Sequence, residues 1–364
     1  MTKIHINKKK FRKSMTSLLI IIVLLLSVFF LYKHYFINPN SSFTNEEDTT
    51  EPLSLTQPNY DELYTFLEGE QSNIELISSI EFTATNPTDT AIAGSAITYG
   101  IDIYGYNTQK EYITEHYNSI TIEEDASAND YIKIRDNVII FYDNSTEPKD
   151  VSIPLSFHSQ EHTFTYSVIK QLVSEDNYAM IINNYTGLDS NYIPSDLTRS
   201  DYITYTNGYD SEVSPMKEVC TKALEDLILD AQVDGYEIYA CSGYRDYITQ
   251  EILYNRAILA LGEDQIDTAH PGCSEHQSGF TMDVVFPDIS WGLTVEQENS
   301  PCYTWMRENA HKYGFILSYE KGYEDISGYM FEPWHYRFIG VELATQYYEE
   351  GFKTLTEFAS IPRY

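Results

Sequence analysis

The sequence predicts an α+β domain with an antiparallel sheet and flanking helices, preceded by a β-rich domain and an N-terminal apolar helix. Three observations lead to this prediction. Residues 15–34 include a long apolar run, residues 72–171 alternate polar and apolar side chains, and residues 172–364 mix helical with strand-like periods. Because the spacing of apolar positions distinguishes helix from strand, the 364-residue chain is expected to divide at these boundaries.

The N-terminus combines a basic flank with an apolar run. Residues 1–14 carry six lysines and arginines and no acidic residue, and residues 15–32 carry no charge. About twenty apolar residues span a bilayer, and a basic flank stays in the cytoplasm. We therefore expect residues 15–34 to be a single transmembrane anchor, with residues 1–14 cytoplasmic and the bulk of the chain extracellular. A cleaved signal peptide is the alternative, although the bulky residues 29–32 do not suit a cleavage site.

Residues 35–71 are predicted to form an acidic and polar tether. Residues 38–58 are rich in Asn, Ser, Thr, Pro and acidic side chains, with few apolar positions. Such a composition buries too little apolar surface to fold by itself. A short helix is expected only near residues 59–67.

The β-rich segment, residues 72–171, is predicted to be an immunoglobulin-like sandwich. Its apolar positions recur every second residue, and Asn, Asp, Gly, Ser and Pro separate the runs. This pattern is typical of antiparallel strands with one buried face. The runs lie at 74–76, 80–82, 101–103, 120–122, 132–134, 138–142, 153–157 and 164–168. We interpret the segment as a spacer, and binding to a wall polymer or another partner stays open.

The C-terminal half alternates helical and strand-like segments. Ser214 followed by Pro215 is typical of a helix start, and Gly235 follows the helix end. One face of this helix is predicted to be apolar, formed by Val219, Cys220, Ala223, Leu224, Leu227 and Ala231. Further helices are expected at 247–261, 303–313 and 341–350, and strands at 236–241, 281–286 and 315–317.

Three short segments carry the side chains of a metal hydrolase: residues 242–245 (SGYR), 274–283 (SEHQSGFTMD) and 332–335 (EPWH). A catalytic zinc ion takes three protein ligands and keeps a fourth position for water, whose pKa it lowers towards ~7. His276, Asp283 and His335 supply two imidazoles and one carboxylate, which suits this set. The sequence therefore predicts one Zn²⁺ site at these three residues.

Two further residues complete the expected chemistry. A carboxylate outside the ligand set must take a proton from water and pass it to the leaving amine, and we assign this role to Glu332. On a plain strand, residues three apart point to opposite faces, so Pro333 would have to bend the chain to bring Glu332 beside His335. Arg245 follows a predicted strand, and its planar guanidinium suits a substrate carboxylate or an oxyanion.

These segments resemble the VanY-type D-alanyl-D-alanine carboxypeptidases, zinc peptidases related to the lysostaphin and hedgehog fold. The resemblance covers residues 172–364. It implies zinc ligands at His276, Asp283 and His335, the general base at Glu332 and a substrate-holding role for Arg245. It also implies that Ser274 and Gln277 lie beside the bound terminal D-alanine. Ser278 and residues 280–282 depart from the family pattern, which bears on the shape of the pocket rather than on the ligands.

The four cysteines, Cys220, Cys241, Cys273 and Cys302, all lie in the C-terminal half. An even count outside the cell permits two disulfides, and four cysteines allow three pairings. We favour Cys220 with Cys241 and Cys273 with Cys302. A thiolate ligand from Cys241 or Cys273 is the alternative, but neither has C-x-x-C spacing and the His/Asp/His set is already complete.

The net charge of −32 argues against nucleic acid as a partner, because binding a polyanion needs a basic surface. The expected partners are peptidoglycan stem peptides, with the membrane engaged through one N-terminal helix. We expect a cell-surface D,D-carboxypeptidase that removes C-terminal D-alanine by attack of a zinc-bound water. An L,D-carboxypeptidase acting on tetrapeptide stems and a non-catalytic wall-binding protein are the alternatives.

Overall fold

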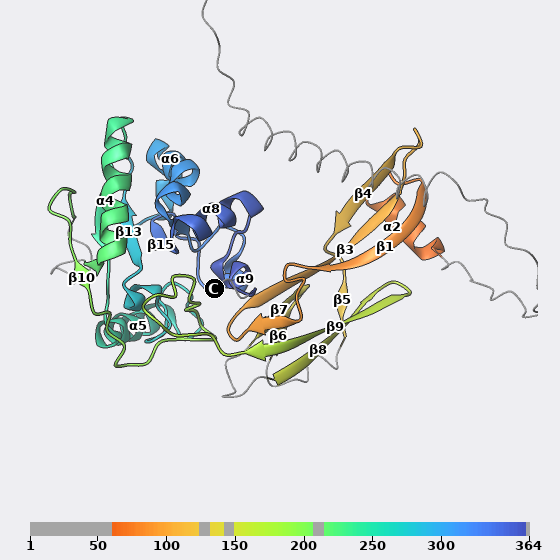
Figure 1. Cartoon of the computed structure of the whole chain (residues 1–364), viewed down its shortest axis with the longest axis horizontal. Coiled ribbons are helices and arrows are strands. Elements are labelled where there is room, and N and C mark those ends of the chain that lie inside the picture. The colour runs from red at the N-terminus through yellow and green to blue at the C-terminus, as the bar shows by residue number, and fades with distance from the viewer. Residues whose placement is uncertain (1–59, 124–131, 142–148, 207–214, 362–364) are drawn as a thin grey trace, which may run out of the picture. The chain divides into compact units, whose positions relative to one another are not determined.

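The computed structural model describes residues 60–123, 132–141, 149–206 and 215–361 (Figure 1). The described residues belong to one compact unit that spans 59–364. No helix among them is both long enough and apolar enough to cross a bilayer. The predicted anchor at residues 15–34 lies outside the described residues.

The β-rich domain contains two sheets. One has the order β1-β3-β7-β6 with β4 paired to β3, and the other has the order β2-β9-β8-β5. All of the pairings are antiparallel except that of β2 with β9. The strands are β1 Leu76–Ala84, β2 Thr90–Ile92, β3 Ala96–Tyr106, β4 Tyr112–Tyr117, β5 Thr121–Ile122, β6 Ile132–Arg135, β7 Val138–Phe141, β8 Lys149–Phe157 and β9 Gln160–Ile169.

Apolar side chains from both sheets form one core. Ile97 and Tyr99 of β3 pack in the same cluster as Ile153 of β8 and Tyr166 of β9, and each is at most 1% exposed. The alternation of polar and apolar residues therefore corresponds to one buried face of the strands, as predicted. The two packed sheets agree with a sandwich, and the immunoglobulin-like class stays a prediction. Strands β2 and β4 were not predicted from the sequence.

A helix interrupts the predicted tether. Residues Asp61–Gly69 form α2, and Leu63 and Leu67 are buried in a cluster with Ile77 and Phe157 of the β-rich domain. The prediction of a tether over 35–71 is therefore wrong at its C-terminal end. The short helix expected near residues 59–67 is ordered because its apolar face covers the sheet.

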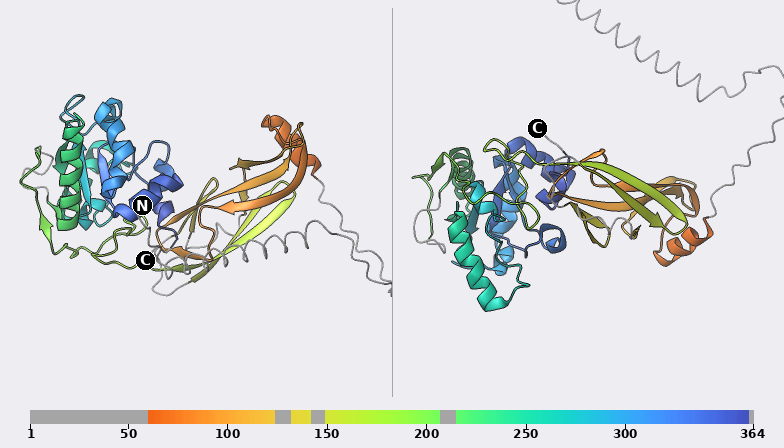
Figure 2. Two further views of the ribbon diagram at one scale, coloured as in Figure 1. Left: turned by 45° about the horizontal axis from the view of Figure 1, so that its top comes forward. Right: turned by 90° about the horizontal axis from the view of Figure 1, so that it is seen from below.

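The C-terminal domain is α+β, as predicted, with an antiparallel four-stranded sheet of order β12-β13-β15-β14 (Figures 1 and 2). Its strands are β12 Tyr239–Ser242, β13 Thr281–Val285, β14 Phe315–Leu317 and β15 His335–Phe338, with a separate pair β10 Leu197–Thr198 and β11 Met216–Lys217. Its helices are α4 Glu218–Val233, α5 Tyr247–Leu261, α6 Pro301–Asn309, α7 Glu324–Ser327, α8 Val341–Glu350 and α9 Leu355–Phe358, with short 3₁₀ turns η1 Glu275–Ser278, η2 Val295–Asn299 and η3 Ala310–Tyr313.

The two faces of this sheet have different roles. Met282 and Tyr336, on adjacent strands, belong to the main core, which α4 and α6 also line. Since side chains alternate along a strand, Asp283 and His335 project from the opposite face. One face of the sheet therefore packs against the core, and the other face carries the polar side chains of the candidate site.

Helix α4 begins later than predicted. Met216 and Lys217 pair as β11 with β10, so the helix starts at Glu218 rather than at Ser214 and Pro215. The backbone N–H of Lys217 donates to the carbonyl of Gly279, which holds this stretch extended. Of the predicted apolar face, Val219 is 39% exposed, while the partly buried Ala223 packs against the core. The buried residues of the helix are Cys220, Thr221, Leu224, Leu227, Ile228 and Ala231.

The predicted disulfides are not present, since all four cysteines are thiols. Cys220 and Cys302 lie in the main core together with Ala240. Cys241 follows Ala240 on β12, so its side chain points to the opposite face of the sheet from Cys220. Cys273 lies in the loop before η1, and burial raises the pKa of its thiol to about 11.

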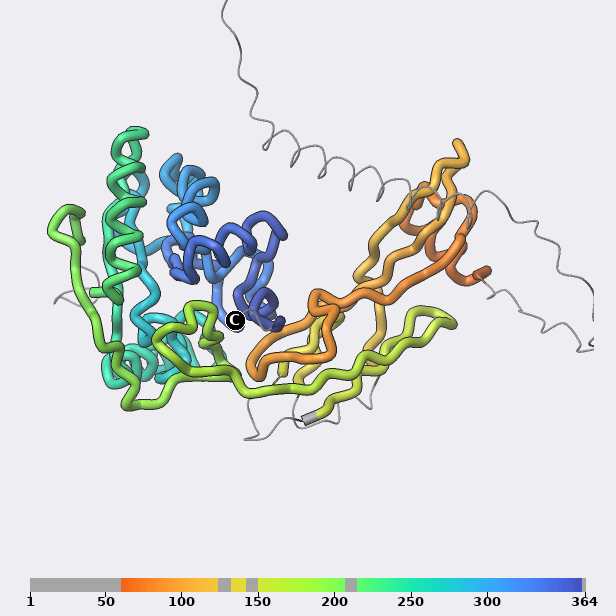
Figure 3. Tube along the Cα trace, viewed as in Figure 1, coloured from red at the N-terminus to blue at the C-terminus, as the bar shows by residue number. Residues whose placement is uncertain are grey.

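A long segment without helix or strand links the β-rich domain to β10, and Figure 3 traces its course from residue 170 to residue 196. Buried hydrogen bonds fix it to its neighbours. The side-chain amide of Asn183 donates to the carbonyl of Gly94 in the β-rich domain at 2.9 Å, and the backbone N–H of Leu188 donates to the carbonyl of Gly272 in the C-terminal domain at 2.8 Å. The segment therefore packs on both domains of the unit.

Candidate metal centre

Three residues of the C-terminal domain converge on one buried point. Asp283, on the central strand β13, is the cross-strand partner of His335 on β15. His276 comes from η1, the turn just before β13. The ligand atoms of the three side chains lie within 4.8 Å of one another, and each residue is at most 4% exposed. The structure thus brings together the three predicted zinc ligands.

The orientation of His276 is set by its backbone surroundings. Its Nδ1 donates to the carbonyl of Gly243 at 2.7 Å, in the loop that follows β12. Its Nε2 then lies 3.4 Å from Oδ2 of Asp283. A metal-binding imidazole commonly donates its second N–H to a carbonyl or carboxylate, which fixes the nitrogen that faces the metal. Nε2 is therefore the nitrogen of His276 that faces the candidate metal position.

His335 has the opposite orientation. Its Nε2 donates to Oε2 of Glu275 at 3.0 Å, and its Nδ1 lies 3.1 Å from Oδ1 of Asp283. The Glu275 carboxylate also accepts from Ser318 at 2.6 Å and from the buried guanidinium of Arg337 at 3.1 Å. Glu275 was not among the predicted site residues, although it directly precedes the candidate ligand His276. Its position identifies it as the residue that fixes Nδ1 of His335 towards the metal.

The electrostatics of the centre fit a cation. The charges of His276 and His335 lower the pKa of Asp283 far below its usual value, despite its burial. Bonds to Asp283 and Glu275 raise the pKa of His335 to about 10, although burial opposes this. Oδ1 of Asp283 is buried and makes no well-aligned hydrogen bond. A bound metal ion would therefore compete with a proton for His335.

Glu332 lies beside the ligands, as predicted. Its Oε2 is 3.4 Å from Nδ1 of His335. Residues 332–335 form a turn before β15, closed by the N–H of His335 donating to the carbonyl of Glu332 at 3.2 Å. This turn places residues three apart on the same side, which a straight strand would not allow. Burial and the nearby Asp283 raise the pKa of Glu332 to about 8, against the effect of His335 and Arg245.

Arg245 is held rigidly in the same cavity. Its guanidinium donates to Oγ of Ser242 and to Oε1 of Gln250, both at 3.0 Å. Gln250 is 1% exposed and is itself anchored to the carbonyl of Ala269. Sequence analysis did not identify Ser242 or Gln250 as supports for Arg245.

The cavity has a volume of about 740 Å³, and the metal ligands, Glu332, Arg245 and Ser274 all line it. Gln277 does not line it. Its side-chain amide donates to the carbonyls of Asp189 and Tyr192, at 2.9 and 3.4 Å. The prediction that Gln277 contacts substrate is therefore wrong, because this side chain holds the segment before β10 against η1.

Comparison with known proteins identifies the family. Residues 214–341 match the family model "VanY: D-alanyl-D-alanine carboxypeptidase". The carboxypeptidase YodJ of Bacillus subtilis (strain 168) is 31% identical over 192 residues, which cover 52% of this chain and 70% of that protein. The chain belongs to the VanY family. A D-alanyl-D-alanine carboxypeptidase of Enterococcus faecium is 31% identical over 53% of this chain and 61% of that protein.

Solved structures of related proteins cover about half of this VanY-family chain. LdcB, an LD-carboxypeptidase, is 32% identical over 50% of this chain and 86% of its own, with a TM-score of 0.47. VanY from a VanB-type vancomycin resistance cassette, solved with Zn(II), is 26% identical over 50% of this chain and 98% of its own, with a TM-score of 0.41. The family model is described as a D-alanyl-D-alanine carboxypeptidase, and the His/Asp/His donor set of this member fits zinc.

Glu275→Gln is expected to weaken zinc binding about 10–100-fold. The amide lacks the charge that orients His335 and pairs with Arg337. The zinc dissociation constant should be measured by competition with a chromogenic chelator, together with kcat and KM at saturating zinc. Ser318→Ala, which removes only one bond to Glu275, is the matched control and should have a smaller effect. Unchanged zinc affinity in Glu275→Gln, in a variant with normal melting temperature, would contradict the positioning role.

Proposed function

We propose that this VanY-family protein is a D,D-carboxypeptidase that removes the C-terminal D-alanine of peptidoglycan stem peptides. The observation that carries the proposal is the convergence of three metal ligands, one extra carboxylate and one guanidinium in a single cavity. A peptide that ends at Arg245 would place its last peptide bond near Glu332. The activity in the name of the matched family supports the same reaction.

Each side chain has a defined part in the proposed reaction. Zinc held by His276, Asp283 and His335 would supply Lewis acidity, lowering the pKa of water and polarising the scissile carbonyl. Glu332 takes the proton of the attacking water and delivers it to the nitrogen of the departing D-alanine. A bound dication beside Glu332 would favour its carboxylate form, which is the form that a general base requires.

Arg245 holds the substrate carboxylate in this proposal. Ser242 and Gln250 fix the guanidinium before substrate arrives, so little side-chain freedom is lost on binding. Ser274 lines the same cavity and could donate its hydroxyl to the terminal carboxylate. A free C-terminus is therefore the group that this wall of the cavity recognises, which favours an exopeptidase over an endopeptidase.

Incubation with synthetic stems tests the reaction. The chain from residue 59 onwards, loaded with zinc, is given pentapeptide and tetrapeptide stems with and without a chelator, and free D-alanine is measured by mass spectrometry. Chelator-sensitive release from the pentapeptide supports the D,D-carboxypeptidase. Release from the tetrapeptide alone would assign the L,D reaction instead. No release from either stem would exclude both reactions and favour a non-catalytic surface role.

Arg245→Gln is expected to lower kcat/KM for the pentapeptide about 10–100-fold, mainly through KM. A hydrogen bond between charged groups contributes about 1.5–3 kcal/mol, and the carboxylate is present in both the ground state and the transition state. Arg256→Gln is the matched control, because Arg256 lines the same cavity from α5 and is exposed. Steady-state kinetics that show equal losses in the two variants would contradict a specific role for Arg245.

The proposal includes a location at the cell surface. The basic residues 1–14 and the apolar residues 15–34 support an uncleaved anchor with a cytoplasmic N-terminus and an extracellular catalytic domain. In this arrangement the β-rich domain, which we propose to be immunoglobulin-like, would act as a spacer between the membrane and the peptidase. Protease accessibility on intact cells tests the orientation, since cleavage of the C-terminal domain requires that it lie outside.

A further inference from the structure

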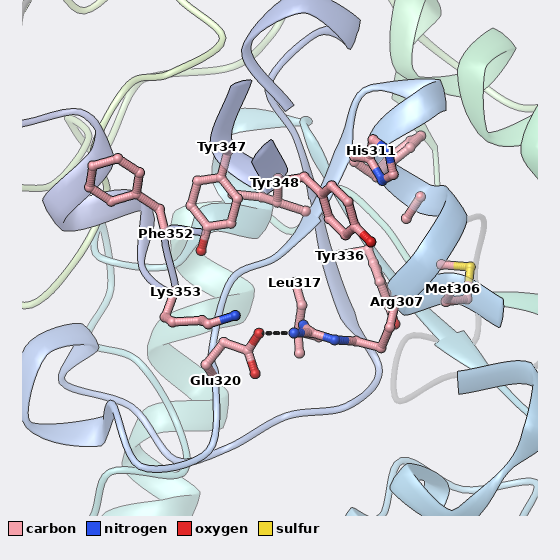
Figure 4. A pocket seen from close by; sticks show the side chains of 13 residues that line it. Met306, Arg307, His311, Leu317, Glu320, Tyr336, Tyr347, Tyr348, Phe352 and Lys353 are labelled. Carbon is pink, nitrogen blue, oxygen red and sulfur yellow. Dashed lines mark ion pairs between the residues drawn. The ribbon is translucent and has the colours of Figure 1, made fainter. Parts of the chain in front are cut away.

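A second cavity lies on the other face of the catalytic sheet. It has a volume of about 350 Å³ and is bounded by α6, η3, β14, β15 and the segment around α8. Figure 4 shows its side chains, among them Arg307, Glu320, Tyr336, Tyr347 and Lys353. None of these residues lines the cavity that contains the metal ligands.

Two tyrosine hydroxyls in this cavity have no hydrogen-bond partner within the described part of the chain. Tyr336 is 1% exposed and Tyr347 is 6% exposed, and both hydroxyl oxygens are buried. A buried polar group without a partner costs about 1–3 kcal/mol. Burial raises the pKa of both phenols well above the usual value, so both stay neutral and can donate a hydrogen bond. Such donors are typical of a site that awaits an acceptor.

Two cations and one carboxylate line the cavity, while Glu357 and Glu275 also act on Tyr347. Arg307 forms an ion pair with Glu320, and the Glu320 side chain is 12% exposed. Lys353 also lines the cavity and extends its ammonium group towards Glu320 (Figure 4). The two cations exceed the one carboxylate by a single charge. Together with two neutral hydroxyl donors, this excess favours a ligand that carries one negative charge.

The remaining walls are apolar and aromatic. Leu317 and Phe352 line the cavity, and the ring of Tyr348 stacks on His311 with centroids 3.9 Å apart. Ligand sites in proteins typically combine apolar walls with a few convergent polar groups. Apart from Glu320 and the neutral form of His311, the polar groups here are hydrogen-bond donors. Such a lining suits a small molecule that has an acidic group and an apolar substituent.

We propose that this cavity binds a small monocarboxylate with an apolar substituent, with the carboxylate held by Tyr336, Tyr347 and the Arg307/Lys353 pair. A free amino acid and a short acyl acid share this chemistry. They differ because only the amino acid has an ammonium group, which could donate a hydrogen bond to Glu320. The inference is independent of the proposed reaction, because it uses none of the residues that line the metal cavity.

Occupancy of this cavity would act on the metal centre through two short connections. Tyr336 directly follows the ligand His335 on β15. Glu320 directly follows Tyr319, whose ring lies 4.5 Å from that of His335. A ligand that fixes Tyr336 and Glu320 would therefore restrain the backbone on both sides of His335. The ligand is expected to alter kcat for the stem peptide at a fixed zinc concentration.

Calorimetric titration tests the binding. Zinc-loaded protein carrying Arg245→Gln is titrated with propionate, D-alanine and alaninamide up to tens of millimolar, because loss of Arg245 weakens carboxylate binding in the catalytic cavity. Propionate and D-alanine should bind, and alaninamide should not. Tighter binding of D-alanine would identify an amino-acid site, and equal or tighter binding of propionate an acyl-acid site. Absence of binding by both acids, or equal binding of alaninamide, overturns the proposal.

Paired variants locate the site. Tyr336→Phe with Tyr347→Phe, each in the Arg245→Gln background, should weaken carboxylate binding at least about tenfold, since a hydrogen bond to a charged group is lost. The melting temperature should hold or rise, because the lost hydroxyls have no partner in the described structure. Lys353→Gln should weaken binding as well. Unchanged affinity in a folded double variant would place the binding elsewhere and overturn the assignment.

Discussion

Glu332→Gln is expected to lower kcat/KM for the stem peptide by about 10²–10⁴ while zinc binding is retained. The amide is nearly isosteric with the carboxylate, but it cannot accept a proton from water or deliver one to the leaving amine. The Glu332 carboxylate lies 3.4 Å from the nearest imidazole nitrogen of His335. The measurement is steady-state release of D-alanine, with zinc content determined by atomic absorption on the same preparation.

Glu296→Gln is the matched control for this experiment. Glu296 lines the same cavity from η2, and its carboxylate is fully exposed. The same change of charge there should leave kcat/KM within about twofold. A Glu332→Gln enzyme with near-normal kcat would rule out the general-base assignment. A variant that loses zinc as well as activity would instead make Glu332 part of the metal site.

Asp283→Asn is expected to abolish activity by removing zinc. Asp283 is the charged ligand of the set, and it lies between the two imidazoles at 3.4 and 3.1 Å. A neutral amide is a poorer ligand, so the zinc dissociation constant should rise by more than the roughly 10–100-fold seen for residues outside the ligand set. The measurement is zinc affinity by chelator competition, followed by activity across a series of zinc concentrations.

Asp267→Asn provides the comparison, because Asp267 is exposed and lines the same cavity without contacting the ligands. It should retain both zinc and activity. Partial recovery of Asp283→Asn activity at high zinc would support a role in holding the metal. Full activity of Asp283→Asn at low zinc, with normal zinc content, would show that another residue completes the site.

The chemistry of the site was readable from the sequence because it depends on residue identity within short segments. His276, Asp283, His335, Glu332 and Arg245 were each assigned before the fold was known, and the structure places all five in one cavity. Several elements were also predicted with correct bounds, among them α5 and α8, because the glycine that follows each of these helices is a local signal.

The errors arise where a distant segment decides the outcome. The start of α4 moved to Glu218 because Lys217 bonds to Gly279, some sixty residues away. Gln277 turned from the cavity to carbonyls near residue 190. The cysteine pairing failed because strand alternation separates Cys241 from the core that contains Cys220. No local sequence pattern predicts these long-range contacts, because each contact depends on which surfaces the fold brings together.

The sequence by itself determined which side chains are candidates for the metal ligands and the base, and it determined the alternation of helices and strands. These follow from side-chain chemistry and from periods within a few residues. The tertiary structure alone decided how these residues act. It pairs Asp283 with His335 across two strands, turns Glu332 to the same side, and assigns Glu275 and Arg337 to orient an imidazole. Those relations join residues up to 62 positions apart, and only packing of the sheet brings them within hydrogen-bonding distance.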